Sequence, residues 1–284
     1  MKYYIVFLTL ISVSTAFAVT PNAIYGKDDR VEVIDYPNAA VRDLARAVAV
    51  QMSPDNLSTM DGSNKFYGLE SKTLKEEYNL CDGVRFENQP SVGRCTGFLI
   101  SSTKLVTAGH CAYSQEDCKD MFWVFDYQTN KNKTPISIQQ KNIYQCKQVL
   151  KIKMTKEGKD FAVIELARPV TDRPYFKTAS SFSSITKNTP VLTIGNPLGL
   201  PTKIADNGVI TDTSHSEMLR TNLDTFQGAS GSPVLNAKTL EVIGILIGGA
   251  IDHVQTAEGC DKPIIYQTVG KEKISRIKQI YSYF

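Results

Sequence analysis

The 284-residue sequence predicts an all-β protein. Residues 98–106 have the pattern of two short strands joined by a turn. Residues 160–166 form a half-buried strand that begins with an acid, and residues 242–249 form a buried strand that ends in glycines. The length suits one all-β unit of about 200 to 250 residues with an N-terminal extension. We find no internal repeat.

A candidate nucleophile lies in the segment Leu223–Pro233, which reads Leu-Asp-Thr-Phe-Gln-Gly-Ala-Ser-Gly-Ser-Pro. Glycines flank Ser230 at positions 228 and 231, which suits a tight turn that exposes one hydroxyl and directs backbone N–H groups at one point. Acyl transfer needs both, and each oxyanion donor lowers the barrier by roughly 3 to 4 kcal/mol. The N–H groups of Gly228 and Ser230 would be these donors. Glycine and serine also cluster in ordinary loops, so this segment alone leaves both interpretations open.

Two further segments carry a resemblance. Thr107-Ala108-Gly109-His110-Cys111 follows the strand pair at residues 98–106, and Asp160 begins the strand at residues 160–166. The order His110, Asp160, Ser230, each at the edge of a β segment, resembles that of the chymotrypsin-like serine proteases. The resemblance covers residues 91–284. It is closest to the bacterial V8-like (glutamyl endopeptidase) branch, whose Gly-Asn-Ser-Gly-Ser-Pro block is similar to Gly228–Pro233.

This resemblance implies two six-stranded antiparallel β-barrels with a C-terminal helix, and an active site between the barrels. Residues 91–284 would be the peptidase domain. It implies a serine endopeptidase in which Ser230 attacks the peptide carbonyl, His110 transfers the proton, and Asp160 orients the imidazole. Residues 191–199 would open the second barrel, residues 264–269 would be its last strand, and the apolar stripe in residues 271–284 predicts the terminal helix.

The first 18 residues have the parts of a secretory signal peptide. Lys2 precedes an apolar run over residues 3–13, and Ala16-Phe17-Ala18 fits the cleavage rule. No later apolar run reaches the roughly 18 residues that span a bilayer. We therefore expect a secreted or periplasmic protein. The formal net charge of +3 calls for neither nucleic acid nor membrane as a partner.

Residues 19–90 predict an N-terminal extension, with a short propeptide, that wraps the barrels and covers a sheet edge. Residues 24–33 resemble the mature N-terminal segment of the glutamyl endopeptidases, which would place the mature end near Ala23; a cut after Arg30 is the rival. Residues 41–52 have helical spacing, although residues 48–50 could equally begin a strand.

Six cysteines after an export signal predict disulfides, and six allow fifteen pairings. The resemblance implies that Cys95 and Cys111 brace the histidine loop. Cys118 and Cys146 border strand-like segments that would be neighbours in one barrel, which leaves Cys81 with Cys260. Phe226 stands where the family's bridge across the primary pocket has a cysteine.

Substrate preference departs from the V8-like pattern. Where that branch has a glutamate-reading histidine, this sequence has Leu246. Asp224, six residues before the nucleophile, has the spacing that places a carboxylate at the base of the primary pocket in trypsin-like enzymes, so the resemblance favours lysine or arginine before the scissile bond, the P1 position. Asp224 could instead turn aside to local backbone, and Asp252 is another candidate wall residue. The predicted substrate-binding residues are Asp224, Gln227, Leu246, Gly248 and Gly249.

Activation is a second departure. Chymotrypsin-like zymogens have an aspartate at the position of Ala229, which pairs with the newly cut amino terminus. If this chain is a zymogen, we expect the N-terminal segment to act by packing or by blocking the cleft.

The remaining features define alternatives. The lysines of residues 126–159 fit a solvated outer face, or a surface that attracts acidic partners. His215 and His253 are interpreted as surface or structural residues, and no metal or other cofactor is expected. We expect a monomer that acts on protein or peptide substrates, with a proteinaceous inhibitor as a further candidate partner. The rival functions are a glutamyl or broad-specificity endopeptidase and a non-catalytic binding or adhesion protein.

Overall fold

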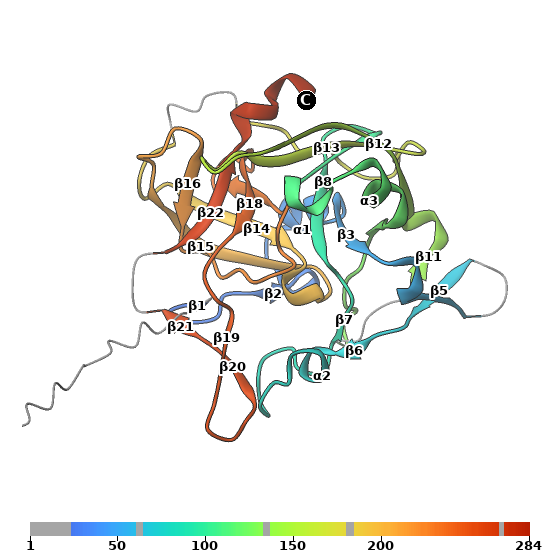
Figure 1. Ribbon diagram of the computed structural model, residues 1–284, viewed down its shortest axis with the longest axis vertical. Helices are drawn as coiled ribbons and strands as arrows, with labels where there is room; N and C mark the ends of the chain where they lie inside the picture. The colour runs from blue at the N-terminus through green and yellow to red at the C-terminus, as the bar shows by residue number, and fades with distance from the viewer. Residues whose placement is uncertain (1–23, 61–64, 133–136, 180–184, 267–269) are drawn as a thin grey trace, which may run out of the picture.

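The protein forms two antiparallel β-barrels that lie side by side (Figure 1). The structure, a computed structural model, describes residues 24–60, 65–132, 137–179, 185–266 and 270–284. The predicted signal peptide at residues 1–18 lies outside this described part. No helix among the described residues has the length and apolar character needed to cross a membrane. The predicted fold class is confirmed.

The first barrel closes with six strands in the order β10, β12, β13, β9, β8, β3. Strands β8 and β9 are the two short strands expected near residues 98–106, and a four-residue turn joins them. Phe98 and Trp123 fill the interior as fully buried side chains. The strands are β3 (Val48–Met52), β8 (Cys95–Leu99), β9 (Lys104–Thr107), β10 (Phe122–Phe125), β12 (Ile143–Met154) and β13 (Asp160–Leu166).

Residues 41–52 contain the end of a helix and then a strand, so both alternatives that the sequence offered are present. Helix α1 (Ala39–Ala45) begins at Asn38, whose side chain accepts hydrogen bonds from the N–H groups of Ala40 and Val41. Strand β3 then follows and pairs with β8 and β10. The first barrel thus contains residues 48–52, which the sequence analysis placed in the N-terminal extension.

The second barrel has the order β14, β17, β18, β22, β16, β15, and the pairing of β15 with β14 closes it. A short N-terminal strand, β2 (Val31–Glu32), pairs with β15 and covers part of its edge. The barrel strands are β14 (Pro190–Gly195), β15 (Lys203–Asp212), β16 (Met218–Thr221), β17 (Pro233–Asn236), β18 (Val242–Gly248) and β22 (Glu272–Arg276).

The C-terminal region differs from the prediction. The last barrel strand is β22 rather than residues 264–269, of which β21 (Ile265–Tyr266) pairs with β1 (Ile24–Tyr25) and 267–269 lie outside the described residues. Barrel pairing overrides the helical pattern at Ile274, since its strand pairs with both β16 and β18 and its side chain joins the core of the second barrel. The chain then ends in a 3₁₀-helix, η6 (Ile277–Tyr283), whose buried Ile277 and Ile280 have the three-residue spacing of that helix.

Small elements surround the barrels. Near the lower edge in Figure 1, the hairpin of β19 (His253–Gln255) and β20 (Asp261–Pro263) lies beside α2 (Leu74–Tyr78). Helix α2 begins with a capping box between Thr73 and Glu76. The other short elements are α3 (Gln115–Asp120), β4 (Leu57–Thr59), β5 (Phe66–Leu69), β6 (Lys72–Thr73), β7 (Pro90–Ser91), β11 (Ile138–Gln139), η1 (Val33–Asp35), η2 (Pro54–Asn56), η3 (Gly109–Cys111), η4 (Gln140–Asn142) and η5 (Pro197–Gly199).

Three disulfides join these parts. The disulfide between Cys95 and Cys111, which the resemblance implied, joins the start of β8 to the histidine loop that follows β9. The other two join Cys118 to Cys146 in the first barrel and Cys81 to Cys260 across 179 residues. The last one ties α2 to the β19–β20 hairpin, so it fixes an outer loop of the second barrel to the N-terminal half of the chain.

Candidate active site

His110 and Asp160 meet at one corner of the first barrel. His110 lies on the 3₁₀-turn η3 (Gly109–Cys111), which follows β9 directly, and Asp160 is the first residue of β13. The Asp160 carboxylate accepts from His110 Nδ1 at 2.8 Å through Oδ2 and from the His110 backbone N–H at 3.1 Å through Oδ1. Two contacts from one carboxylate fix both the ring and its backbone. A carboxylate only accepts, so Nδ1 carries the proton and Nε2 is left as a base.

The backbone of Asp160 is itself held in place. The Asp160 backbone N–H donates to the hydroxyl of Ser275 on β22 at 3.3 Å, a contact between the two barrels. Gly109 leaves room for it, since a Cβ there would lie 2.9 Å from Asp160 Oδ1. The glycine before the histidine is therefore required by the close approach of Asp160.

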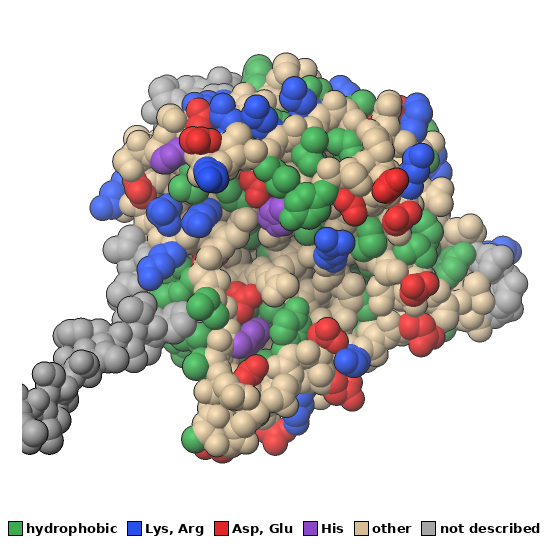
Figure 2. All heavy atoms as spheres, in the orientation of Figure 1, with side chains coloured by type: hydrophobic (Ala, Val, Ile, Leu, Met, Phe, Trp, Pro, Cys, Tyr) green, Lys and Arg blue, Asp and Glu red, His purple; other side chains and the backbone are tan. Residues whose placement is uncertain are grey.

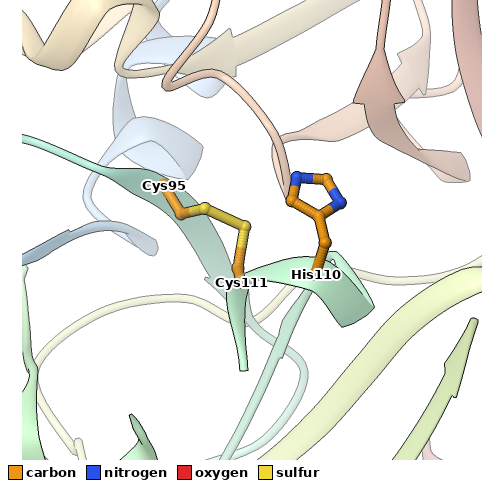
Figure 3. A group of neighbouring side chains, drawn as sticks. All are labelled: Cys95, His110 and Cys111. Carbon is orange, nitrogen blue, oxygen red and sulfur yellow. A yellow bond between two sulfur atoms is a disulfide. The ribbon is translucent and has the colours of Figure 1, made fainter. Parts of the chain in front are cut away.

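The Cys95–Cys111 disulfide braces the histidine turn from the other side. Figure 3 shows it bridging β8 to the turn that carries His110. The potential ligand atoms of Cys95, His110 and Cys111 lie within 4.8 Å of one another, the one such group among the described residues. Both sulfurs are consumed by the disulfide, so no thiolate is available to bind a metal there.

Ser230 reaches the same corner from the second barrel. Its loop connects β16 to β17, and Gly228 and Gly231 adopt φ values of 86° and 91°. The Ser230 carbonyl accepts from the N–H of Thr96 at 2.8 Å and contacts Cys111 Sγ at 3.8 Å, so the serine lies against the histidine turn. Among the described residues the Ser230 hydroxyl has no hydrogen bond with His110; such catalytic contacts often form only once substrate binds.

The peptide between Gln227 and Gly228 points its N–H group away from the protein. The Gln227 carbonyl accepts from the N–H of Leu198, and the Gly228 carbonyl accepts from Thr96 Oγ1 at 3.0 Å. In a trans peptide the N–H points opposite to the carbonyl, so the Gly228 N–H faces outward. Within the described ranges neither this N–H nor that of Ser230 has an acceptor. The described contacts therefore leave these two N–H groups unpaired, as the predicted oxyanion hole requires.

Thr96 was missed by sequence reasoning. It lies on β8, and its hydroxyl also accepts from the N–H of Asn196, so one side chain of the first barrel holds the serine loop of the second. Its position 134 residues before Ser230 leaves no local signal. Ala229, at the position where chymotrypsin-like zymogens have an aspartate, is 3% exposed and donates its N–H to the Phe226 carbonyl at 3.0 Å. The described contacts of this turn therefore do not use an acid at that position.

The comparisons with known proteins agree with this geometry. A family model described as the trypsin-like peptidase domain matches residues 95–245, just over half of the chain. The chain belongs to the trypsin-like peptidase family. It is a serine endopeptidase of the chymotrypsin fold, as the sequence analysis expected.

Two solved structures resemble this trypsin-like peptidase. A Glu endopeptidase in complex with MPD has a TM-score of 0.52 and 16% identity, covering 92% of this chain and 96% of that one. The Vibrio cholerae VesB protease has a TM-score of 0.52 and 12% identity, covering 90% of this chain and 66% of that one. At these identities the likeness concerns the fold alone. No curated protein matches the chain in sequence.

A cavity of about 470 Å³ opens beside Ser230 in this peptidase. Figure 2 shows the hollow in the middle of this face, with acidic side chains in it and below it. Four of the five predicted substrate-binding residues line the cavity, namely Gln227, Leu246, Gly248 and Gly249.

Asp224, the fifth, does not line the cavity. Its side chain is turned toward the N-terminal segment, where Oδ1 accepts from the N–H of Tyr25 and Oδ2 from the N–H of Asp29, both at 2.7 Å. It is 3% exposed, and burial raises its pKa to about 6. The trypsin-like placement of this carboxylate is therefore wrong, because a distant stretch of backbone provides its donors.

Other polar residues line the cavity instead. Asp252, which the sequence analysis weighed as a wall residue, is present, together with Glu272 and His253. His253 lies between the rings of Tyr78 and Phe226, and burial lowers its pKa to about 4. The sequence analysis missed Glu272 because the stretch after Lys271 has a helical pattern.

Proposed function

We propose that the protein is an exported serine endopeptidase that hydrolyses peptide bonds through an acyl-enzyme on Ser230. The observation that carries this proposal is the pairing of His110 Nδ1 with Asp160 at 2.8 Å beside the turn of Ser230. Nε2 of His110 takes the proton of the Ser230 hydroxyl as this oxygen attacks the peptide carbonyl. The N–H groups of Gly228 and Ser230 stabilise the oxyanion.

The same groups complete the reaction. His110 then delivers its proton to the leaving amine, and the acyl group stays on Ser230. Water, activated by His110, attacks the ester carbonyl, and the released serine takes back the proton. Asp160 stabilises the imidazolium at both steps without accepting a proton. The protease-fold binding module is the weaker alternative, because no member of the triad is missing from the chain.

Export is supported by two observations. The sequence begins with the parts of a signal peptide, and all six cysteines are in disulfides, which form and persist in oxidising compartments. The mature end near Ala23 fits a segment that pairs with β21 from Ile24 and then, through β2, with β15 of the second barrel. A cut after Arg30 is less compatible with the fold, since this side chain is 2% exposed and beyond the reach of a processing protease. We further propose a monomer that acts on protein or peptide substrates.

Replacement of Ser230 tests the proposed function. Ser230→Ala should lower kcat on the order of 10⁶-fold and abolish the mass adduct that a fluorophosphonate forms with the protein. Ser232→Ala is the matched control, because its buried hydroxyl has no hydrogen-bond partner among the described residues. This control should keep the adduct and most of the activity. Undiminished hydrolysis by Ser230→Ala would exclude the assignment.

A further inference from the structure

The cavity beside Ser230 contains two carboxyl groups that the proposed mechanism does not use. Asp252 lies in the loop after β18, and Glu272 begins β22. Among the described residues that line the cavity there is no lysine or arginine. The cavity therefore offers negative charge next to the nucleophile, with no cationic wall residue to neutralise it.

Glu272 is held by donors from three parts of the chain. Oε2 accepts from Thr225 Oγ1 at 2.6 Å, and Oε1 accepts from the Tyr25 hydroxyl at 3.1 Å and the N–H of Ala250 at 3.3 Å. It is 2% exposed. Gly249 makes space for it, since a Cβ there would lie 1.7 Å from Oε2. A glycine predicted to face the substrate backbone thus accommodates an acid in the cavity wall.

Asp252 is less completely paired. Its Oδ2 accepts from the N–H of Gln227 at 2.8 Å, and among the described residues no donor reaches Oδ1. Gln227 directly precedes the oxyanion turn, so this contact places the carboxyl group close to the reacting bond. One oxygen of Asp252 is free to accept a hydrogen bond from a ligand.

Arg30, a buried cation whose charge acts on Asp252, lies outside the lining of the cavity. Arg30 forms an ion pair with Asp28 at 2.8 Å and stacks 4.0 Å above the ring centre of Phe226. His253, the basic group inside the cavity, is neutral at physiological pH because burial lowers its pKa to about 4. One buried and one partly buried carboxyl without a cation in their own cavity favour a ligand that supplies one.

The apolar walls fit the rest of such a ligand. Phe226, Tyr78 and Leu246 also line the cavity, so they can contact a methylene stem whose charged end approaches the acids. A glutamyl side chain would instead bring a third carboxylate next to Asp252 and Glu272, which is unfavourable by like-charge repulsion. The cavity is therefore suited to lysine and arginine and opposed to glutamate.

We propose that Asp252 and Glu272 select substrates with lysine or arginine at P1, the residue before the scissile bond, with Asp224 acting only on the N-terminal segment. This proposal rests on the proposed peptidase function. Tyr25 positions Glu272: its backbone N–H is fixed by Asp224, its ring stacks on Tyr266 at 4.8 Å, and its hydroxyl also accepts from the N–H of Lys271. The trypsin-like acid and the acid in the cavity are thus linked through one tyrosine.

Binding can be separated from catalysis with 4-aminobenzamidine, a cationic probe whose fluorescence reports occupancy. The Ser230→Ala protein should bind it, and adding Glu272→Gln or Asp252→Asn should weaken binding at least tenfold each. Glu258→Gln removes the same charge from the exposed turn between β19 and β20 and should change binding less than twofold. If the probe binds in this pattern but the wild type hydrolyses no peptide, the proposed function is wrong, whereas the inferred recognition of a cation by the two acids is retained.

Peptide hydrolysis gives the second readout. We expect kcat/KM for arginine to exceed that for neutral citrulline at P1 by about 100-fold, and Glu272→Gln to reduce this ratio to below tenfold. Glu258→Gln, the exposed control, should leave the ratio unchanged. The inference is overturned if the probe binds the cavity variants as well as their parent, or if glutamate or citrulline is cleaved as well as arginine.

The pH dependence of probe binding adds a check. Burial raises the pKa of Asp252 to about 6 and that of Glu272 to about 7, so both acids ionise as the pH rises from 5 to 8 and the cationic probe should bind more tightly. Affinity that is constant over this range would contradict the proposal. The titratable and charged groups facing the two acids are each other, Tyr25, Tyr78, His253 and Arg30.

Discussion

The proposed catalytic corner and the proposed specificity cavity both depend on carboxylates, but the chain holds them differently. Asp160 and His110 are 50 residues apart on elements of one closed barrel, and they contact each other directly. Glu272 in the cavity depends on Tyr25, 247 residues away, and on Thr225 of the second barrel. The proposed histidine–aspartate pair therefore rests on one barrel, whereas the acids of the cavity are held by contacts among distant segments.

Each region also has its own disulfide. Cys95–Cys111 closes a separation of 16 residues next to His110, and Cys81–Cys260 closes one of 179 residues beside the hairpin that follows Asp252. The carbonyl of Asp252 accepts from the N–H of Ile264, just beyond that hairpin. Because the braces are separate, the two regions should respond separately to mutation.

The largest effect is expected at the catalytic corner. Asp160→Asn keeps the size of the side chain but replaces an acceptor with a donor, which favours the wrong tautomer of His110. We expect kcat to fall about 10⁴-fold with KM changed little, measured by initial rates on an arginyl peptide. Asp120→Asn, at the exposed end of α3, is the control and should behave as wild type. A loss below tenfold would mean that His110 is oriented by other contacts.

Removal of the two disulfides compares the regions directly. Replacing Cys95 and Cys111 by serine should lower kcat by about tenfold or more, because small displacements of a catalytic group are costly. Replacing Cys81 and Cys260 should mainly raise KM for basic substrates. Each change should also lower the free energy of unfolding by about 2 to 5 kcal/mol, measured by denaturant titration. An identical kinetic change in both variants would refute the separation of the two regions.

The smallest effect concerns pH and stability. Burial raises the pKa of Asp224, Asp252 and Glu272 to about 6, 6 and 7, so the folded state holds these protons more tightly than the unfolded state. Their contribution to stability is thus present at low pH and is lost as the pH rises from about 4 to 7. Ionisation of Glu272 alone should lower the free energy of unfolding by about 1 to 3 kcal/mol as the pH rises over that range.

Denaturant titrations at several pH values test this linkage. Glu272→Gln does not titrate, so its stability should decline less between pH 4 and 7 than that of the wild type. Glu258→Gln, in which an exposed acid is replaced, should decline as the wild type does. Equal declines in wild type and Glu272→Gln would show that Glu272 is not the group responsible.

The sequence alone determined the fold class and named the three proposed catalytic residues. Strands β8, β9 and β13 follow from local alternation and turn residues, and His110, Asp160 and Ser230 are recognised because each lies in a short motif at a strand edge. These patterns are local, so neighbouring residues are sufficient to predict them. The C-terminal strand β22 was missed for the opposite reason, since only pairing with β16 and β18 distinguishes it from a helix.

Only the tertiary structure decided where the pocket acids lie. Spacing from Ser230 placed Asp224 at the base of the pocket, but the N–H groups of Tyr25 and Asp29 turn it away, from 199 and 195 residues distant. Thr96 reaches the serine loop in the same way, across the two barrels. A carboxylate turns toward the nearest donors, and the chain's folding brings those donors from segments that no spacing rule connects.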